Sequence, residues 1–264
     1  MAAGRWGDLA PRLGSAVVMV LAGSGALWAG GVVFAGFVAL ICGAMVWELS
    51  RMLDPKGSAT AMQMGIMTGA MILLASWLPP FYIVPFLLAP SMAGATRVGA
   101  DKGIYVAYAA VIALAGYALI AVRLNLGVAW VLWLILVVVA SDVAGYFAGK
   151  SIGGAKLWPR VSPNKTWSGT VAGWVGAGAV GWFFAPMVGA GSELVLVLVS
   201  VVMSMVAQAG DIAESALKRR AGVKDSSALI PGHGGVMDRF DGMLGAALFM
   251  LLSIVVFGYP AGLM

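Results

Sequence analysis

Residues 194–218 read LVLVLVSVVMSMVAQAGDIAESALK. The first 17 of these residues carry no charge, and Asp211 then opens a polar segment. Because a bilayer core of about 30 Å needs about 20 residues of helix, this stretch predicts a membrane-spanning helix with a polar end. If the helix continues, the residues at i, i+3, i+4 and i+7 share one face, namely Asp211, Glu214, Ser215 and Lys218.

The composition extends this prediction to the whole chain. Of 264 residues, 61% are hydrophobic and 10% are charged, and the mean hydropathy is +0.97. These values exclude a water-soluble globular domain, a disordered chain and a disulfide-built secreted module. One cysteine, Cys42, and one histidine, His233, exclude a disulfide and a multi-histidine metal site. We therefore expect an all-α, polytopic integral membrane protein whose net charge of +5 serves membrane topology and not nucleic acid.

The uncharged stretches predict the number of spans. They run over residues 13–47, 57–96, 103–122, 124–141, 166–192, 194–210 and 242–264. The first two are too long for one crossing each, and residues 28–31 (WAGG) and 78–80 (LPP) supply turns within them. Splitting both predicts about nine transmembrane helices and places 15 of the 16 Lys and Arg residues on one face, with Arg123 as the exception. By the positive-inside rule, that face and the N-terminus are cytoplasmic.

The first 30 residues have a second interpretation. Arg5 and Arg12 precede an apolar run, as they would in a cleaved signal peptide. The run continues without charge to Trp47, which favours a helical hairpin over a signal peptide.

Charge is concentrated in two polar segments, residues 141–168 and 210–241, which carry 15 of the 27 charged residues. Both segments are predicted to be cytoplasmic, so we expect the chemistry of the protein there. We therefore divide the chain into residues 1–140, which are N-terminal transmembrane helices without a motif, and residues 141–264, a catalytic transmembrane region.

The first residues of the second polar segment have a functional and a structural interpretation. Asp211 lies near the predicted membrane boundary, where a carboxylate is costly and is usually functional. A solvated helix end with a Glu214–Lys218 ion pair is the simpler alternative. The four cations of residues 218–224 suit substrate phosphates or lipid head groups.

The end of this segment is rich in glycine and aspartate. Residues 231–235 (PGHGG) suit a loop that cradles a phosphate, or an ordinary turn. Asp238 and Asp241 are three residues apart and suit Mg²⁺ ligands on one helix. Asp241 also suits the N-cap of the last helix.

The first polar segment offers a second set of candidates. Asp142 ends an 18-residue uncharged run and again lies near the predicted boundary. A flexible segment of glycines and lysines from Gly149 leads to Ser162, Lys165 and Thr166, whose ammonium and hydroxyl groups suit a polyphosphate. The segment lacks Gly-x-x-x-x-Gly-Lys-Ser/Thr and is not a P-loop. An ordinary basic cytoplasmic loop is the alternative.

Together these segments resemble the phosphatidate cytidylyltransferase (CDP-diacylglycerol synthase) family. The family signature matches residues 215–241 at Ser215, Lys218, Arg219, Lys224, Asp225, Pro231, His233, Gly234, Gly235, Asp238, Arg239 and Asp241, with Gly210, Asp211 and Glu214 upstream. The other cytoplasmic motif of the family is similar to Asp142–Gly169 at Tyr146, Phe147, Gly149, Ser162, Pro163, Lys165 and Thr166, with departures at Asn164 and Ser168.

The resemblance implies that CTP and phosphatidate react to give CDP-diacylglycerol and pyrophosphate, in phospholipid biosynthesis at a bacterial-type inner membrane. It also implies a homodimer and bound Mg²⁺, with a second cation as an open alternative. The metal ligands implied are Asp211 and Asp238 first, then Asp142 and Asp241. The catalytic residues implied are Asp211, Asp238 and Lys218. The substrate-binding residues implied are Ser162, Lys165, Thr166, Ser215, Arg219, Lys224, His233, Gly234, Gly235 and Arg239.

The sequence has three alternative interpretations. A transporter of an anionic substrate places ionisable groups near the bilayer midplane, often in repeated halves, whereas the charges here lie at the ends of spans. Asp238-x-x-Asp241-Gly242 resembles the opening of the CDP-alcohol phosphotransferase motif, but no acidic residue follows Asp241. Another CTP-dependent lipid-phosphate enzyme stays an alternative.

If both polar segments serve one reaction, we expect the Lys165 region to lie within about 20 Å of Asp211, the reach of one nucleotide and its metals.

Overall fold

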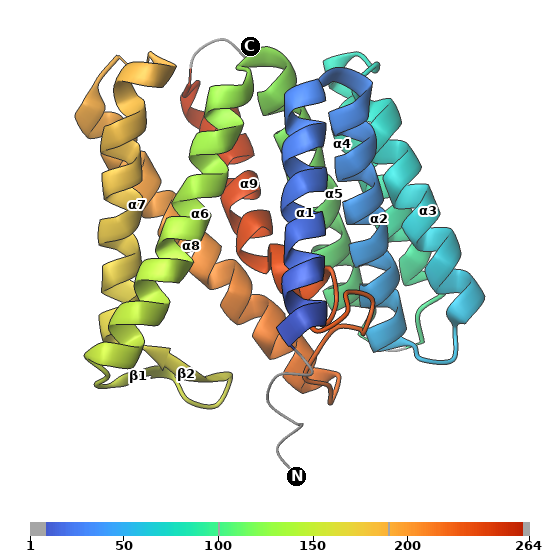
Figure 1. The fold of residues 1–264 in the computed structure, drawn as a ribbon. Coiled ribbons are helices and arrows are strands. Elements are labelled where there is room, and N and C mark those ends of the chain that lie inside the picture. The colour runs from blue at the N-terminus through green and yellow to red at the C-terminus, as the bar shows by residue number, and fades with distance from the viewer. Residues whose placement is uncertain (1–8, 100, 190, 261–264) are drawn as a thin grey trace. The chain divides into compact units, whose positions relative to one another are not determined.

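The computed structural model describes residues 9–99, 101–189 and 191–260, so that Arg5 lies outside the described residues (Figure 1). Within these ranges the chain forms nine helices and two short strands. The helices are α1 (Leu9–Ala29), α2 (Gly31–Leu53), α3 (Ser58–Ala75), α4 (Pro80–Ala95), α5 (Lys102–Asn125), α6 (Val128–Ser151), α7 (Trp167–Val188), α8 (Glu193–Arg220) and α9 (Met237–Phe257). The strands β1 (Lys156–Trp158) and β2 (Ser162–Thr166) pair as an antiparallel hairpin. The all-α prediction is therefore confirmed, with this hairpin as the departure from it.

Both predicted breaks in the long apolar stretches are present. Gly30 separates α1 from α2 with a φ of +63°, a conformation that is strained for residues with a side chain. α3 ends at Ala75, and α4 begins at Pro80. Proline fits the first turn of a helix, because its missing N–H has no helical partner there. The prediction of two helices in each long stretch is confirmed.

Eight of the described helices are long and apolar enough to cross a bilayer. The shorter helix is α4, whose 16 residues span about 24 Å at about 1.5 Å per residue. That length is less than the bilayer core of about 30 Å. The protein is thus an all-α polytopic membrane protein, while the ninth crossing and the cytoplasmic N-terminus stay predictions.

The chain packs as two compact units. The first comprises Met1–Ile120 and Ala221–Phe240, and the second comprises Ala121–Arg220 and Asp241–Met264. The boundaries therefore fall within α5 and α9, and at the end of α8. The division of the chain at residue 140 concerns motifs and not packing, and it stays a prediction.

In the first unit, α2 packs against α1 and α3, and α3 packs against α4. Glycines let α2 and α3 approach closely. A Cβ atom at Gly43 would lie 2.8 Å from the backbone oxygen of Gly65, and one at Gly69 would lie 2.8 Å from that of Ala39. In a bilayer the hydrophobic effect does not drive helices together, so their association depends on close packing. Small residues such as these glycines allow that close packing.

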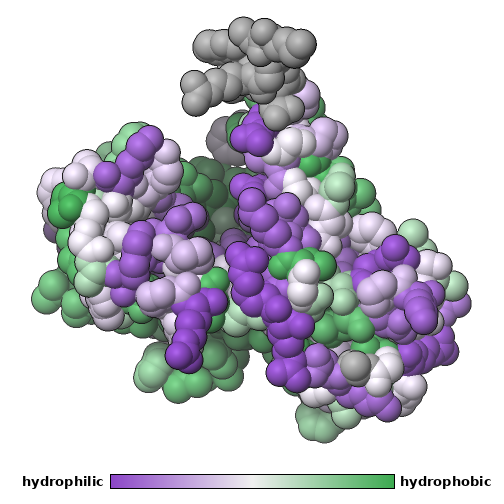
Figure 2. Space-filling view, turned by 90° about the horizontal axis from the view of Figure 1, so that it is seen from below, coloured by the Kyte–Doolittle hydropathy of each residue, from purple (hydrophilic) through white to green (hydrophobic). Residues whose placement is uncertain are grey.

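In the second unit, α7 packs against both α6 and α8. α6 continues to Ser151, so Gly149 belongs to a helix and not to the predicted flexible segment, and Asp142 lies inside α6. The helix extends this far because the residues after Asp142 are compatible with helix until Gly153 and Gly154, which both have positive φ. The hairpin follows and leads directly into α7. Figure 2 shows hydrophilic residues gathered over the hairpin end of this unit and hydrophobic residues along its flank.

Candidate active site

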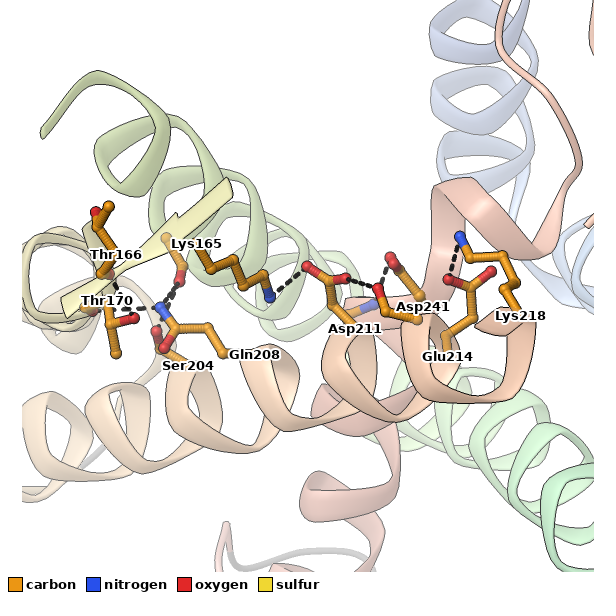
Figure 3. A network of polar contacts seen from close by, with 12 residues as sticks. Lys165, Thr166, Thr170, Ser204, Gln208, Asp211, Glu214, Lys218 and Asp241 are labelled. Carbon is orange, nitrogen blue, oxygen red and sulfur yellow. Dashed lines mark hydrogen bonds and ion pairs between the residues drawn. The ribbon is translucent and has the colours of Figure 1, made fainter. Parts of the chain in front are cut away.

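The polar end of α8 is helical, as the sequence predicts. α8 continues to Arg220, so that Asp211, Glu214, Ser215 and Lys218 share one face. Lys165 of β2 reaches this face and makes an ion pair with Asp211 (Figure 3). The expectation that the Lys165 region lies close to Asp211 is confirmed.

Gly210 brings the backbone of α9 next to α8 beside Asp211. A Cβ atom at Gly210 would lie 2.8 Å from the backbone oxygen of Asp241, so a larger side chain would push the two helices apart. The carboxylates of Asp211 and Asp241 point toward one another (Figure 3). In the second unit, the neighbour of Asp211 on the last helix is therefore Asp241. Asp238 belongs to the first unit, and its role as a metal ligand stays a prediction.

Asp142, on α6, joins the same group of charges. Its carboxylate interacts electrostatically with Asp211 and Lys165. Asp241 in turn interacts with Asp211, Asp142 and Lys218. We call these five residues, Asp142, Lys165, Asp211, Lys218 and Asp241, the carboxylate cluster. Three carboxylates within electrostatic range repel one another unless a positive charge lies between them.

Lys218 is also held by its own helix. Its Nζ lies 2.5 Å from Oε2 of Glu214, whose side chain is fully buried. The predicted ion pair at i, i+4 is therefore confirmed, whereas the interpretation of this segment as a solvated helix end is wrong for Glu214, which is buried. The hydroxyl of Ser215 donates to Oδ1 of Asp211 at 3.4 Å, whereas Arg219 is exposed. The catalytic role of Lys218 and the substrate contacts of Ser215 and Arg219 stay predictions.

The hairpin carries three predicted substrate-binding residues, Ser162, Lys165 and Thr166, all in β2. Thr166 is buried and is the N-cap of α7, because its Oγ1 accepts a hydrogen bond from the N–H of Gly169 at 3.2 Å. The side chain of Lys165 is still 25% exposed beside Asp211, so a substrate phosphate can reach it. Substrate binding by Ser162 and Thr166 stays a prediction, and for Thr166 the structure adds a structural role.

Gln208 lies one turn before Asp211 on α8 and was not predicted from the sequence. Its Nε2 donates to Oγ of Ser141 at 3.2 Å and to the backbone oxygen of Thr170 at 3.3 Å. Its Oε1 accepts from Nε1 of Trp174 at 3.1 Å. These contacts tie α8 to α6 and α7 and so orient the helix that carries Asp211 (Figure 3). An amide inside an apolar span was the signal available in the sequence.

The first unit holds a polar pocket of about 350 Å³, which we call the basic pocket. It is lined by Arg12, Lys224, Asp225, Gly232, His233, Gly234 and Arg239. Gly232 and Gly234 have φ values of +74° and +84°, and the N–H of Ile230 closes the turn by donating to the backbone oxygen of Gly234 at 2.8 Å. The lining carries three basic side chains and one carboxylate, and this surplus of positive charge suits an anionic phosphate group. Four predicted substrate-binding residues, Lys224, His233, Gly234 and Arg239, are brought together here.

α1 contributes two residues to this region that the sequence did not indicate as site residues. Arg12 lines the basic pocket. The hydroxyl of Ser15 donates to the backbone oxygen of Pro231 at 3.0 Å and lies 2.8 Å from Nδ1 of His233. A hydroxyl has one proton, so when Pro231 receives it, Nδ1 of His233 is the donor in the second contact. The histidine ring is thus held in place from α1.

Two buried carboxylates order the loop that forms the pocket. Oδ2 of Asp238 accepts hydrogen bonds from the N–H of Ser226 at 2.9 Å, the N–H of Gly235 at 2.8 Å and the hydroxyl of Ser226 at 3.0 Å. Glu48 of α2 accepts hydrogen bonds from three further groups at the two ends of the loop, and its Oε2 competes with Asp238 for the hydroxyl proton of Ser226. Glu48 was not predicted as a site residue, although it directly follows the uncharged stretch 13–47. The same signal selected Asp211.

The N-cap interpretation of Asp241 is wrong. α9 begins at Met237, so Asp241 lies in the second turn of the helix. The N–H groups of Val236 and Met237 at the start of α9 donate to Glu48 instead, at 2.8 Å and 2.7 Å. These are donors that a helix leaves without a partner in its first turn.

The carboxylate cluster fits Mg²⁺ by its chemistry. Among the described residues, no three His, Cys, Asp or Glu side chains form a complete metal cage. Mg²⁺ does not require one, because one or two carboxylates usually hold it while water and substrate phosphates complete its octahedral shell. Asp211 and Asp241 are the facing carboxylates that could hold such an ion (Figure 3).

Comparison with known proteins shows to which family the chain belongs. The sequence model of the cytidylyltransferase family matches residues 10–257. A phosphatidate cytidylyltransferase of Brucella suis biovar 1 is 34% identical over 263 residues, which cover 96% of each chain. Phosphatidate cytidylyltransferases of Helicobacter pylori and Bacillus subtilis are 43% and 39% identical over 132 residues, which cover 50% of this chain and 49% of theirs. The chain therefore belongs to the cytidylyltransferase family.

Proposed function

We propose that the protein transfers the cytidylyl group of CTP to phosphatidate and releases CDP-diacylglycerol and pyrophosphate. Membership of the cytidylyltransferase family supports this reaction, as do the names of the relatives. The observation that carries the proposal is the carboxylate cluster, in which residues from α6, β2, α8 and α9 meet. Carboxylates can hold a divalent metal ion, and lysines can pair with phosphates; transfer of a nucleotidyl group uses both to neutralise negative charge.

The reaction makes one bond and breaks another at the α-phosphorus of CTP. A phosphate oxygen of phosphatidate forms the new bond, and the bond from the α-phosphorus to the oxygen bridging it to the β-phosphate breaks. The electron pair of that bond leaves with pyrophosphate. Because the nucleophile is already an anion, the protein needs no strong general base. It needs to align the reactants and to neutralise their accumulated negative charge.

The residues of the carboxylate cluster divide these tasks. Lys165 is partly exposed beside Asp211 and can pass from this ion pair to a substrate phosphate. Mg²⁺ bound by Asp211 and Asp241, with Asp142 nearby, would supply the positive charge that neutralises the triphosphate. Asp211 and Asp241 hold their positions because Gly210 keeps α8 and α9 in close contact.

The predicted roles of Asp238 and of a second cation remain proposals. Oδ2 of Asp238 accepts hydrogen bonds from the N–H groups of Ser226 and Gly235. We assign recognition of a substrate phosphate to the basic pocket, because it combines Arg12, Lys224 and Arg239 with the ring of His233.

The proposed location is the cytoplasmic face of a bacterial-type inner membrane. The distribution of Lys and Arg along the sequence supports this orientation through the positive-inside rule. A reaction between a membrane lipid and CTP also requires an active site at the membrane surface that faces the nucleotide. The homodimer implied by the resemblance stays a prediction.

The proposal is tested with purified protein in detergent micelles that contain phosphatidate and Mg²⁺. CTP labelled in its α-phosphate should give label that extracts with lipid, whereas CTP labelled in its γ-phosphate should give labelled pyrophosphate and unlabelled lipid. Diacylglycerol, which lacks the nucleophilic phosphate, is the control substrate and should give no product. Absence of lipid-extractable label with phosphatidate would reject the enzyme and leave the transporter as the alternative.

A further inference from the structure

Glu48 is a carboxylate in an unfavourable place. It is 0% exposed and lies in α2 about one and a half turns before the helix ends at Leu53. The negative end of the helix dipole disfavours an anion there. Burial of a charge is also costly unless hydrogen bonds compensate for the lost water.

The compensating hydrogen bonds come from two short stretches of the 226–237 loop. Oε1 accepts from the hydroxyl of Ser227 at 2.5 Å and from the N–H of Val236 at 2.8 Å. Oε2 accepts from the hydroxyl of Ser226 at 3.2 Å and from the N–H of Met237 at 2.7 Å. Each oxygen therefore binds one residue at the start of the loop and one at its end. A single side chain of α2 holds the two ends of the loop together.

The fit around this carboxylate is tight. A Cβ atom at Gly235 would lie 2.5 Å from Oε1 of Glu48 and would overlap the hydroxyl of Ser226. The same hydroxyl lies between Glu48 and Asp238, at 3.2 Å and 3.0 Å, and can donate its one proton to either. The requirement for glycine at position 235 thus follows from the presence of Glu48 and Ser226.

All residues of the basic pocket except Arg12 of α1 lie within the loop that Glu48 closes or beside it in the sequence. His233 and Gly234 are inside it, Lys224 precedes it, and Arg239 follows it. We propose that Glu48 is a positioning residue for substrate binding: it closes the 226–237 loop and thereby keeps the basic pocket in the form that accepts a substrate phosphate. The effect of Glu48 on turnover rests on the proposed function, whereas the closure of the loop by Glu48 does not.

The variant Glu48→Gln tests whether the hydrogen bonds of Glu48, and not only its size and shape, keep the loop closed. Each carboxylate oxygen receives one hydroxyl and one backbone N–H. Glutamine keeps the shape but replaces one oxygen by an NH₂ group. The hydroxyl can rotate and accept from this group, but the backbone N–H cannot, so one of the two N–H hydrogen bonds that hold the end of the loop is lost. If the closed loop is then populated in about one molecule in ten, the KM for the substrate bound by the pocket rises about tenfold.

The experiment combines two measurements on the full-length protein in micelles. Amide hydrogen exchange of the 226–237 segment, followed by mass spectrometry, reports the loop without any turnover. Steady-state kinetics with CTP and phosphatidate then give KM and kcat. Glu193→Gln is the matched control, because Glu193 is exposed at the start of α8. Ser227→Ala is the milder variant, which removes one of the four donors and is used if Glu48→Gln does not fold.

The expected result is faster exchange confined to the loop, a KM about tenfold higher for one substrate and a kcat within about threefold of wild type. Ser227→Ala should shift the same quantities in the same direction by less. Unchanged exchange in both variants would overturn the proposal, as would faster exchange throughout the chain or a fall in kcat at constant KM. If the wild type makes no labelled lipid, the proposed function fails, and the exchange measurement alone decides whether Glu48 closes the loop.

Discussion

Gly210→Ala is the sharpest perturbation of the contact between α8 and α9. The new Cβ atom would lie 2.8 Å from the backbone oxygen of Asp241 and 3.4 Å from the backbone nitrogen of Gly245. The shortest usual contact between a carbon and a carbonyl oxygen is about 3.3 Å, so α9 has to move by about 0.5 Å. Backbone atoms line the contact, and no flexible side chain can absorb the shift.

The expected consequences follow from that displacement. Overpacking of this kind costs about 1–3 kcal/mol of stability. A catalytic arrangement needs its groups held within about 0.5 Å, and a misplacement of about 1 Å can lower the rate about 100-fold. We therefore expect kcat to fall about tenfold when Asp241 moves relative to Asp211.

The assay is transfer of α-labelled CTP to phosphatidate in micelles, with the midpoint of thermal unfolding measured in parallel. Gly36→Ala is the matched control, because a Cβ atom at Gly36 of α2 would meet nothing within 4 Å. Alanine is favoured over glycine inside a helix, so this control should retain full activity and stability. A normal kcat and a normal unfolding midpoint for Gly210→Ala would refute the argument that this contact sets the distance between the two carboxylates.

Three further variants test individual residues. Asp238→Asn should lower kcat at least about 100-fold if Asp238 is a metal ligand; a near-normal kcat at saturating CTP and Mg²⁺ would exclude that role. Lys218→Ala should lower kcat, whereas Arg219→Ala should first raise a KM, because the two side chains point about 100° apart around α8; equal effects of both variants on both parameters would remove this distinction. Thr166→Val should destabilise the protein by about 1 kcal/mol through loss of the N-cap, while Thr166→Ser should not, as judged by thermal unfolding; equal stability of the two would contradict the capping role.

The fold was largely predictable because its determinants are local. Uncharged stretches mark apolar helices, and Gly30 and Pro80 interrupt them through backbone restrictions that hold in any context. The end of α6 was predicted less well. The polar Asp142 suggested a boundary, but a helix tolerates one carboxylate, and the chain continues as helix until Gly153.

The residues of the carboxylate cluster could be predicted because four of them carry a charge next to an apolar stretch, and Lys218 shares a helix face with Asp211. Asp211 and Lys165 were expected to share a region, and their ion pair confirms it. Which aspartate of α9 faces Asp211 in the second unit was not predictable. That choice depends on the close approach of Gly210 to the backbone of Asp241, which is a tertiary contact.

The beginning of α9 shows a second limit of sequence reasoning. Asp241 satisfied the usual preference for an N-cap, but the donors at the start of the helix are bound by Glu48, far away in the sequence. Arg12 and Ser15 likewise reach the basic pocket from α1, which carries no motif. These contacts require the fold of the first unit and have no local signature.

The most direct test of the catalytic role of the carboxylate cluster is the kcat of Asp211→Asn with α-labelled CTP and phosphatidate at saturating Mg²⁺. Asn keeps the shape of Asp211 but loses the charge that pairs with Lys165 and would hold the cation. We predict a kcat at least about 100-fold lower, equivalent to about 2.7 kcal/mol of transition-state stabilisation. Glu193→Gln, which removes an exposed carboxylate from the start of the same helix, should leave kcat unchanged. A near-normal kcat for Asp211→Asn would contradict the account, because the reaction would then not depend on this cluster.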